Sequence, residues 1–364
     1  MSLIQRGLLL FVMLQCVGVA GAHADFRDPL DVAASDSDKA VVSMLTAVTQ
    51  TPGGRWVAVG RRGHVLYSDD GKAWQQAEVP VSIDLVAVNF PTAQDGWAVG
   101  HGGVILHSAD AGKTWNKQLD GRQLADLLIE HWKPLAEHAT EDEPSATFAL
   151  QDAERFKEEG PGRPFLDVHF IDARTGYAVG AYNLLLETRD AGASWQVLSE
   201  RADNPGGLHF NAVGEAPDGQ LFLAGEQGML LRGDPRNGRF QAVTTPYEGT
   251  WFGLLERDGL LLLFGLRGNA YVSHDQGMSW KRAATGSTST LTSGALLADG
   301  RVALVSLKGE VLLSNDASGE QFGAVSIARP TPLYGIAPAG AQALIGVGAA
   351  GVTRIDLEST SQSH

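Results

Sequence analysis

The sequence predicts an all-β fold, a seven-bladed β-propeller with one helical insertion between blades 2 and 3. A pattern of four short strands recurs seven times along the 364 residues, at a spacing of about 40 residues. Glycine accounts for 44 residues and shows no collagen period, so it indicates many tight turns rather than disorder. Four-stranded repeats of this length are typical of propeller blades, which bury the two faces of each sheet between neighbours.

The first 24 residues have the pattern of a secretory signal peptide. A charged start is followed by the apolar run LLLFVML at residues 8–14 and by an A-x-A site at Ala22–Ala24. We therefore expect cleavage after Ala24, export, and a periplasmic mature protein. The alternative is a lipoprotein attached at Cys16, although Gln15 stands where a small residue is expected.

Composition excludes several classes of function. Cys16 is the only cysteine, so the mature chain has no disulfide framework, thiolate nucleophile or Cys-ligated zinc site. Lys and Arg total 28 against 42 for Asp and Glu, and a net charge of −14 argues against binding nucleic acid or anionic lipid. No later segment approaches membrane-spanning length. We expect a soluble monomer that inserts no segment into the membrane and binds no metal or cofactor.

Seven copies of the repeat define the blades. Each contains an apolar strand, an Ala-Val-Gly-like strand, a glycine hairpin, a third strand, and an Asp-Gly turn that ends at an aromatic residue. The predicted blades span residues 45–80, 85–120, 165–200, 209–245, 251–285, 291–327 and 333–357 of a propeller domain at 25–364. The seventh copy stops before its fourth strand. We expect residues 26–34 to supply that strand and to close the ring.

The Asp-Gly turns match the Asp-box, also called the BNR repeat. SADAGKTW at residues 108–115 fits S-x-D-x-G-x-T-W, and three other copies differ slightly. In such a turn the carboxylate accepts backbone N–H bonds, glycine supplies a positive φ, and tryptophan fills the space between blades. One box per blade cannot converge on one site, so we interpret them as structural. The predicted structural residues are Asp70, Asp110, Trp115, Asp190, Trp195, Asp275 and Trp280.

The insertion at residues 121–164 lacks the propeller pattern. Leu124, Leu128 and Trp132 share one helical face, and residues 150–159 favour a second helix. A connection between blades emerges on the same face as the hairpins between second and third strands, so we expect the insertion to cap or rim the mouth of the axial channel. Packing of its apolar stripe on the blade beneath is the alternative. The predicted partner-binding residues are Arg61, Arg62, His101, Tyr182, Glu226, Arg267, Lys308 and Trp132.

The strands WAVG and YAVG, followed by G-x-(V/L)-L-x-(S/T)-x-D-x-G-x-(S/T)-W, resemble the photosystem II stability/assembly factor family over residues 45–357. The resemblance implies an exported seven-bladed propeller that binds proteins during the assembly of membrane complexes and has no enzymatic activity. Many members occur in bacteria without photosynthesis. An arginine-rich surface is implicated in partner binding in photosynthetic members, and here only scattered basic residues remain on the hairpins. We therefore expect a different membrane-associated complex or transporter as the partner.

A sialidase-like glycosidase acting on exported glycans is the alternative function, because Asp-boxes also occur in sialidases. Such an enzyme needs three arginines around the substrate carboxylate, an activated tyrosine nucleophile and an acid. The segment Phe26-Arg27-Asp28-Pro29 approximates an F-R-I-P motif, and Tyr334 would serve as the nucleophile. However, Asp28 would compete with the substrate for the adjacent arginine.

Overall fold

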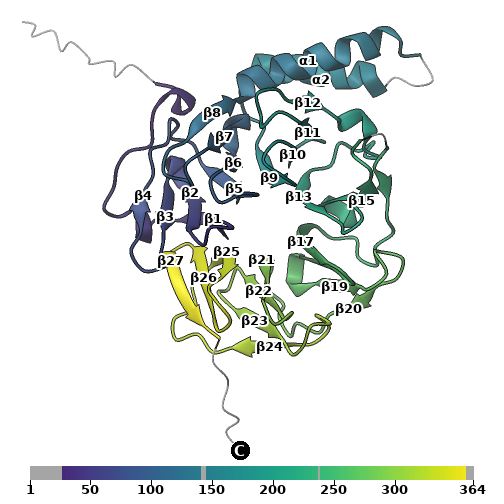
Figure 1. Ribbon diagram of the computed structural model, residues 1–364. Helices are drawn as coiled ribbons and strands as arrows, with labels where there is room; N and C mark the ends of the chain where they lie inside the picture. The colour runs from purple at the N-terminus through teal and green to yellow at the C-terminus, as the bar shows by residue number, and fades with distance from the viewer. Residues whose placement is uncertain (1–26, 141–144, 237, 358–364) are drawn as a thin grey trace, which may run out of the picture.

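Seven antiparallel sheets stand around a common axis in the computed structural model, which describes residues 27–140, 145–236 and 238–357 (Figure 1). Six sheets have four strands and one has three. The sheets follow one another in sequence order around the ring, each with its first strand innermost. The prediction of an all-β, seven-bladed propeller with a helical insertion is confirmed.

The strands of the first four blades fall within the residue ranges given above. Blade 1 contains β1 (Leu45–Gln50), β2 (Trp56–Gly60), β3 (Val65–Ser68) and β4 (Gln75–Gln76). Blade 2 contains β5 (Leu85–Asn89), β6 (Gly96–Gly100), β7 (Ile105–Ser108) and β8 (Asn116–Leu119). Blade 3 contains β9 (Phe165–Phe170), β10 (Gly176–Gly180), β11 (Leu185–Thr188) and β12 (Gln196–Val197). Blade 4 contains β13 (Phe210–Glu215), β14 (Leu221–Gly225), β15 (Leu230–Gly233) and β16 (Gln241–Ala242).

The last three blades complete the ring. Blade 5 contains β17 (Trp251–Arg257), β18 (Leu260–Gly265), β19 (Ala270–Ser273) and β20 (Lys281–Arg282). Blade 6 contains β21 (Leu291–Leu296), β22 (Val302–Ser306), β23 (Val311–Ser314) and β24 (Phe322–Val325). Blade 7 contains β25 (Leu333–Pro338), β26 (Ala343–Gly348) and β27 (Gly351–Asp356).

The repeated glycine at the end of each second strand has a steric cause. A Cβ atom on Gly100 would lie 2.2 Å from the carbonyl oxygen of Asp84, at the entry to the inner strand. Similar clashes would arise at the equivalent glycines, for example 2.1 Å from Thr250 at Gly265. Blade 6 departs from this pattern with Ser306, whose hydroxyl bonds the Glu310 carboxylate at 2.6 Å. The repeat therefore records where two backbones approach closely.

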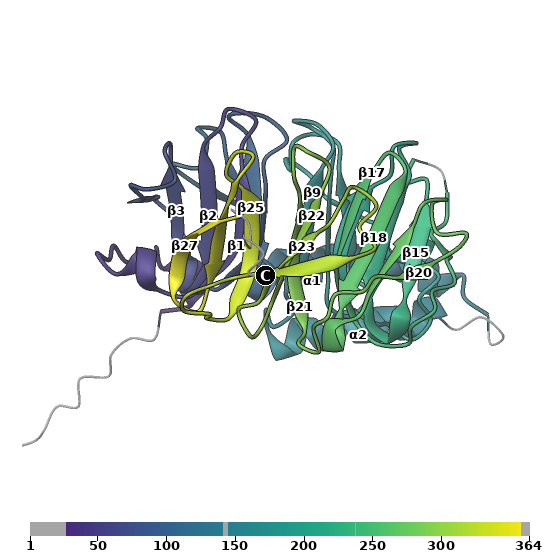
Figure 2. The ribbon, with the colours of Figure 1, turned by 90° about the horizontal axis from the view of Figure 1, so that it is seen from below.

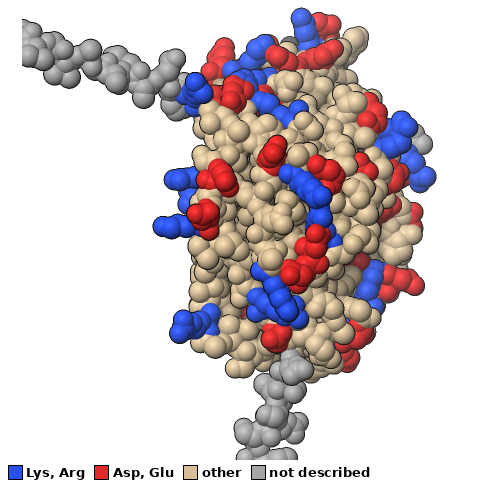
Figure 3. Space-filling view, turned by 60° about the vertical axis from the view of Figure 1, so that its left-hand side comes forward, with Lys and Arg blue, Asp and Glu red and all other residues tan. Residues whose placement is uncertain are grey.

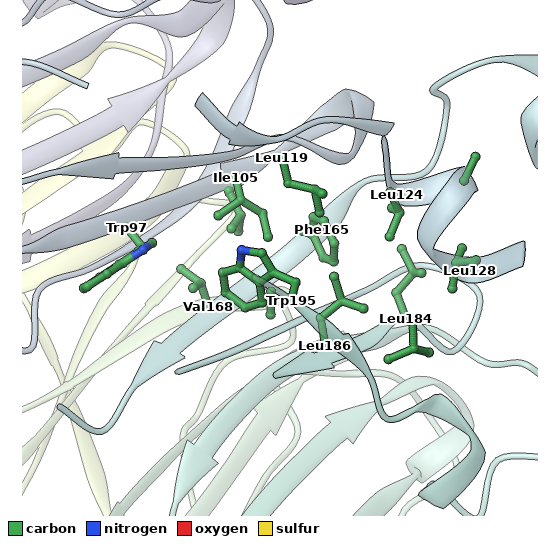
Figure 4. Packing of buried hydrophobic residues seen from close by; sticks show 14 of the residues in the cluster. Trp97, Ile105, Leu119, Leu124, Leu128, Phe165, Val168, Leu184, Leu186 and Trp195 are labelled. Carbon is green, nitrogen blue, oxygen red and sulfur yellow. The ribbon is translucent and has the colours of Figure 1, made fainter. Parts of the chain in front are cut away.

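The hydrophobic core lies between blades. Trp97 of β6 is fully buried and stacks on Phe170 of β9, with ring centroids 3.6 Å apart. Figure 4 shows how side chains of blades 2 and 3 and of the helical insertion meet in this junction, where Trp195 and Leu124 contribute to one cluster. Because each sheet is covered on both faces, its middle strands are buried along their whole length, as in β6 and β10.

The Asp-boxes form the turns between third and fourth strands, on the face opposite the helical insertion. Asp110 accepts the N–H groups of Lys113 and Thr114 at 3.0 and 2.9 Å. Asp275 makes the same kind of contact, and hydrogen bonds from Ser279 lower the pKa of its carboxyl to about 2. Trp115 and Trp195 are buried, whereas Trp280 is only partly buried. These are the contacts of carboxylates that hold a turn.

The described part of the predicted closing segment does not form the fourth strand of blade 7; Phe26 lies outside the described residues. A short 3-10 turn, η1 (Pro29–Asp31), places Leu30 between blades 1 and 2, where this side chain is 1% exposed. Lys117 and Arg122 then hold the segment, since both pair with Asp31. The prediction of closure by residues 26–34 is therefore wrong, because these contacts hold the segment on the other side of blade 1.

The same segment continues across the outside of blade 1 as a strap. Its residues 27–44 pass Gln76, whose side-chain amide donates to the Ser35 carbonyl at 2.9 Å. A second turn, η2 (Ala40–Val42), packs against the start of β27 before the chain enters β1. The rim in this region shows cationic and anionic side chains side by side rather than a field of one sign (Figure 3). The ring closes by direct packing of blade 1 on blade 7 through Leu45, Ile345 and their neighbours.

The insertion forms two packed helices, α1 (Gly121–Glu137) and α2 (Ser145–Glu159). A capping box starts α1. The Gln123 side chain accepts the backbone N–H of Asp120 at 3.0 Å, and the Asp120 carboxylate accepts the backbone N–H of Arg122 at 3.0 Å. Leu124 and Leu128 are buried against blade 3, as the apolar stripe suggested, and the second helix begins five residues earlier than predicted. Residues 141–144 lie outside the described range.

The helices do not cap or rim the mouth of the axial channel. They lie along the outer edge of blades 2 and 3, at one face of the ring (Figures 1 and 2). His131 of α1 reaches Glu200 of blade 3 at 3.0 Å, which fixes this position together with the buried leucines. The prediction that the insertion covers the channel mouth is therefore wrong. The apolar face of α1 packs instead against the outer half of blade 3. No helix in the described ranges is both long and apolar enough to cross a membrane.

Candidate partner-binding surface

The predicted hairpin residues lie on one face of the propeller, which we call the insert face because the helical insertion adjoins it. Each belongs to the hairpin between the second and third strands of its blade. They are exposed, except that Glu226 is half-buried. The set comprises Arg61, Arg62, His101, Tyr182, Glu226, Arg267 and Lys308.

Four of these hairpins hold a side chain on a left-handed backbone, including Gln227 of blade 4 with a φ of 53°. Arg62, Tyr182 and Arg267 have φ values of 56°, 57° and 57°, although glycine occupies the same position in blade 2 as Gly102. This conformation costs an L-residue about 1–2 kcal/mol. Retention of arginine and tyrosine under such strain is a feature associated with functional positions.

The hairpin residues differ in their neighbours. Arg61 lies 3.4 Å from Asp84. Glu226 pairs with His209 at 3.0 Å, and the His209 ring stands edge-on to Tyr182 at 4.8 Å. Within the described residues, no carboxylate lies within ion-pair distance of the side-chain nitrogens of Arg62, Arg267 or Lys308, although the Arg62 backbone N–H donates to Asp84 at 2.8 Å. The insert face therefore displays unpaired cations on a chain of net negative charge.

A groove of about 520 Å³, the insert groove, lies between the helices and blade 3. It brings together two predicted residues from distant parts of the sequence, Trp132 of α1 and Tyr182 of blade 3. Phe148 of α2 is 62% exposed and lies on the same groove. Arg163 forms a rigid wall, because it is buried, pairs with Asp152 at 2.7 Å, and stacks over the Tyr182 ring at 5.2 Å.

The other predicted residues do not join this groove. Arg267 and Lys308 belong to blades 5 and 6, whereas the groove lies at blade 3 and the connection to blade 4. Sequence reasoning missed Phe148, Arg163 and Arg239, which also line it. Phe148 lies in the first turn of α2, just before residues 150–159, where the sequence predicted the second helix. The apolar spacing of the residues in that turn was the available sequence signal for it.

Sequence reasoning also missed a cluster of acidic residues on the innermost strands. Asp167 of β9 accepts N–H bonds from Val213 and Val168, yet burial raises the pKa of its carboxyl to about 6. Glu256 of β17 packs on the backbone of Gly214, and burial raises the pKa of its carboxyl to about 7. The presence of acidic residues in otherwise apolar inner strands was the sequence signal that could have revealed this cluster.

Replacing Glu256 by glutamine should stabilise the protein at pH 8 and have little effect at pH 4.5. The folded pKa lies above the usual 4.5, so the carboxyl favours folding only while protonated, and that contribution is lost as pH rises from about 4.5 to 7. The charge of His169 and a hydrogen bond from the Glu215 backbone oppose this rise in pKa, whereas the carboxylate charges of Asp167 and Glu215 add to it. Urea midpoints of both proteins across this range measure the effect. A difference that is constant with pH would contradict the assignment.

The residues considered for a glycosidase are not arranged as one site. Asp28 accepts the N–H of Leu30 at 2.9 Å, so the segment carrying Arg27 is held against blades 1 and 2. Tyr334 lies on β25, the innermost strand of blade 7. In the described ranges, no three His, Cys, Asp or Glu side chains converge in a metal-binding arrangement.

Comparison with known proteins adds independent information. The sequence signature of the family described as photosynthesis system II assembly factor YCF48 matches residues 32–130 and 160–321. A curated relative, the photosystem II assembly lipoprotein Ycf48 of Synechococcus sp. (strain CC9902), is 24% identical over 299 residues, 76% of this chain and 87% of the relative.

Solved structures show the same fold. A structure of YCF48 bound to a D1 peptide superimposes with a TM-score of 0.62 at 14% identity, covering 88% of this chain and 95% of that one. YCF48 from Cyanidioschyzon merolae gives 0.59 at 14% identity, covering 88% and 97%. The WD40 propeller domain of Doa1 gives 0.62 at 11% identity, covering 92% and 97%, so the fold extends beyond one family. Since the family signature spans well over half of the sequence, the chain belongs to the photosynthesis system II assembly factor YCF48 family.

Proposed function

We propose that this protein is an exported, non-enzymatic assembly factor that binds an extended segment of a membrane-associated protein at its insert face. The observation that carries the proposal is the insert groove, which is bordered by the strained blade 3 hairpin carrying Tyr182 and by the buried cation of Arg163. The family membership supports an assembly role, and the solved YCF48 with a D1 peptide supports recognition of a peptide segment.

The groove has the chemistry of a peptide site. Leu128 and Ala153 form an apolar floor, while Trp132 and Phe148 offer aromatic surface at its edge. Its volume falls within the usual range for ligand pockets, about 300–1,000 Å³, and accommodates a few side chains rather than a folded domain. Exposed aromatic residues beside fixed polar groups are typical of binding hot spots.

We further propose that the partner belongs to a periplasmic or membrane complex or transporter other than a photosystem. The signal at residues 1–24 supports export, although it lies outside the described residues. The lipoprotein nature of the Synechococcus relative is a second indication of export. The acidic composition and the separation of the basic hairpins argue against a single arginine-rich contact surface.

The double substitution Trp132→Ala with Phe148→Ala should reduce partner capture about tenfold, because it removes the exposed ring of Phe148 and the half-buried ring of Trp132 from the groove. The tagged mature chain is cross-linked in envelope extracts, and the captured proteins are quantified by mass spectrometry. Met278→Ala is the matched control, since Met278 is 83% exposed but lies in an Asp-box on the opposite face. Equal capture by the double variant and the control would rule out the groove.

A further inference from the structure

Six blade junctions contain one aromatic residue that comes from the turn between third and fourth strands or from the strand that follows. Each packs against the preceding blade as part of the core between the two sheets. The six are Trp74, Trp115, Trp195, Phe240, Trp280 and Phe322. Within residues 27–357, less the two undescribed gaps, every blade except blade 7 therefore supplies one such plug from its outer half.

The junction between blades 6 and 7 differs from these six. Its core contains only aliphatic side chains among the described residues. In the position that corresponds to the plug lies an open cavity of about 460 Å³. Its apolar wall is formed by Leu313, Val325 and Leu357, and polar residues such as Ser314, Asn315 and Gln342 line the rest. Val325 and Ile327 remain partly exposed, whereas the equivalent Ala77 and Val79 of blade 1 are buried.

Among the described residues, backbone groups on both sides of this cavity have no hydrogen-bond partner and can pair with an added segment. Leu357 donates to the Gln342 carbonyl at 2.8 Å, so by alternation the N–H and C=O groups of Val352, Arg354 and Asp356 point away from β26. Beyond the turn η2 at its start, β27 has no further strand beside it within the described ranges. An open edge of this kind is a template for β-strand addition.

The opposite wall repeats an arrangement seen at the junction of blades 1 and 2. There, Glu78 exchanges two backbone hydrogen bonds of 3.0 Å with Lys113 and Trp115 of the next blade. Ser326 occupies the corresponding position after β24, lines the cavity, and is exposed. The cavity therefore lies between a free strand edge and a backbone segment that elsewhere binds an Asp-box turn.

Charge specifies the incoming segment further. Arg55 of blade 1 points one of its guanidinium nitrogens at the carbonyl of Ala111, 3.5 Å away in the Asp-box of blade 2. Arg301 is its counterpart in blade 6 and is the charged residue that lines the cavity. Each arginine also pairs with a carboxylate of its own blade, Arg55 with Asp69 and Arg301 with Asp299. A cation in this place complements the carbonyl groups and the carboxylate of a turn like those of the other blades.

We propose that this site, the β27 slot, binds an extended segment of a partner protein that adds to β27 as a fourth strand and inserts an aromatic side chain into the cavity. The six filled junctions define the chemistry of that segment: an acidic turn, one tryptophan or phenylalanine, and a short strand. The β27 slot is separate from the insert groove and stands independently of it.

The test uses a peptide that copies the blade 2 donor, Asp110–Leu119, labelled at its N-terminus, and the mature full-length chain. Fluorescence anisotropy should show saturable binding, and the same peptide carrying Trp115→Ser should bind about tenfold more weakly. Hydrogen exchange should slow at the amides of Arg354 and Asp356 when the peptide is bound. Slowing confined to the insert groove would overturn the proposal.

A matched pair of variants tests the strand addition. Arg354→Pro removes an outward N–H without breaking the bonds to β26, whereas Arg354→Val removes the same charge and keeps the N–H. Only Arg354→Pro should lower the affinity strongly, and Phe148→Ala should leave it unchanged. Equal affinity for the proline and valine variants would refute the proposal. Binding that appears only after removal of residues 358–364 would also refute it, because the chain itself would then fill the slot.

Discussion

The substitution Trp115→Ala should lower the free energy of unfolding by about 3–5 kcal/mol, the usual range for a buried tryptophan truncated to alanine. The side chain is 4% exposed and meets the Phe90 ring edge-on at 5.9 Å. Its Nε1 donates to the Gly112 carbonyl at 3.1 Å, so the substitution removes a hydrogen bond as well as apolar contact. Urea denaturation followed by circular dichroism measures the loss.

Trp280→Ala is the matched control for this prediction. It holds the same position in the Asp-box of blade 5, yet its ring is only partly buried and its Nε1 bonds the Thr244 carbonyl of the preceding blade. We expect it to cost less than half as much as Trp115→Ala. Equal costs would mean that burial between blades does not set the contribution of these residues.

The substitution Leu30→Ala should destabilise the protein by about 2–5 kcal/mol, as for other fully buried leucines. Leu30 is 1% exposed and contacts Gly102 and its surroundings between blades 1 and 2. The strap also carries Asp31, which pairs with Arg122 at the start of α1. Loss of the leucine should therefore speed hydrogen exchange in the first turn of α1 as well.

The control for Leu30 is Asp31→Asn, which removes the exposed ion pairs and keeps the apolar anchor. Surface pairs contribute little and are screened by salt, so this variant should differ slightly from the parent at low salt and not at high salt. Urea midpoints at two salt concentrations measure both effects. If Leu30→Ala were as mild as Asp31→Asn, the strap would be only loosely attached.

Most of the fold could be predicted from the sequence because its signals are local and repeated. Glycine at Gly60, Gly100 and their equivalents records a close approach that each blade makes within itself. The capping residue Asp120 and the apolar spacing of Leu124 and Leu128 likewise specify α1 within one short segment. The hairpin face of Arg62, Tyr182 and Arg267 followed from the antiparallel order of strands in any blade.

The candidate sites could be predicted only in part. Tyr182 and Trp132 were each identified, but only the docking of α1 on blade 3 makes them neighbours in one groove. Arg163 gave no signal, because its role depends on Asp152 and on the ring of Tyr182. The raised pKa of Glu256 arises from burial against the backbone of Gly214 in another blade.

The sequence by itself determined the number of blades, the strands within each, and the presence of helices between blades 2 and 3. Only the tertiary structure decided where the segment before blade 1 packs and whether blade 7 gains a fourth strand. The burial of Leu30 and the pairing of Asp31 with Arg122 place residues 27–34 on blades 1 and 2. That choice left β27 without a fourth strand in the described chain. Such choices depend on contacts between residues some 90 positions apart, which no local pattern encodes.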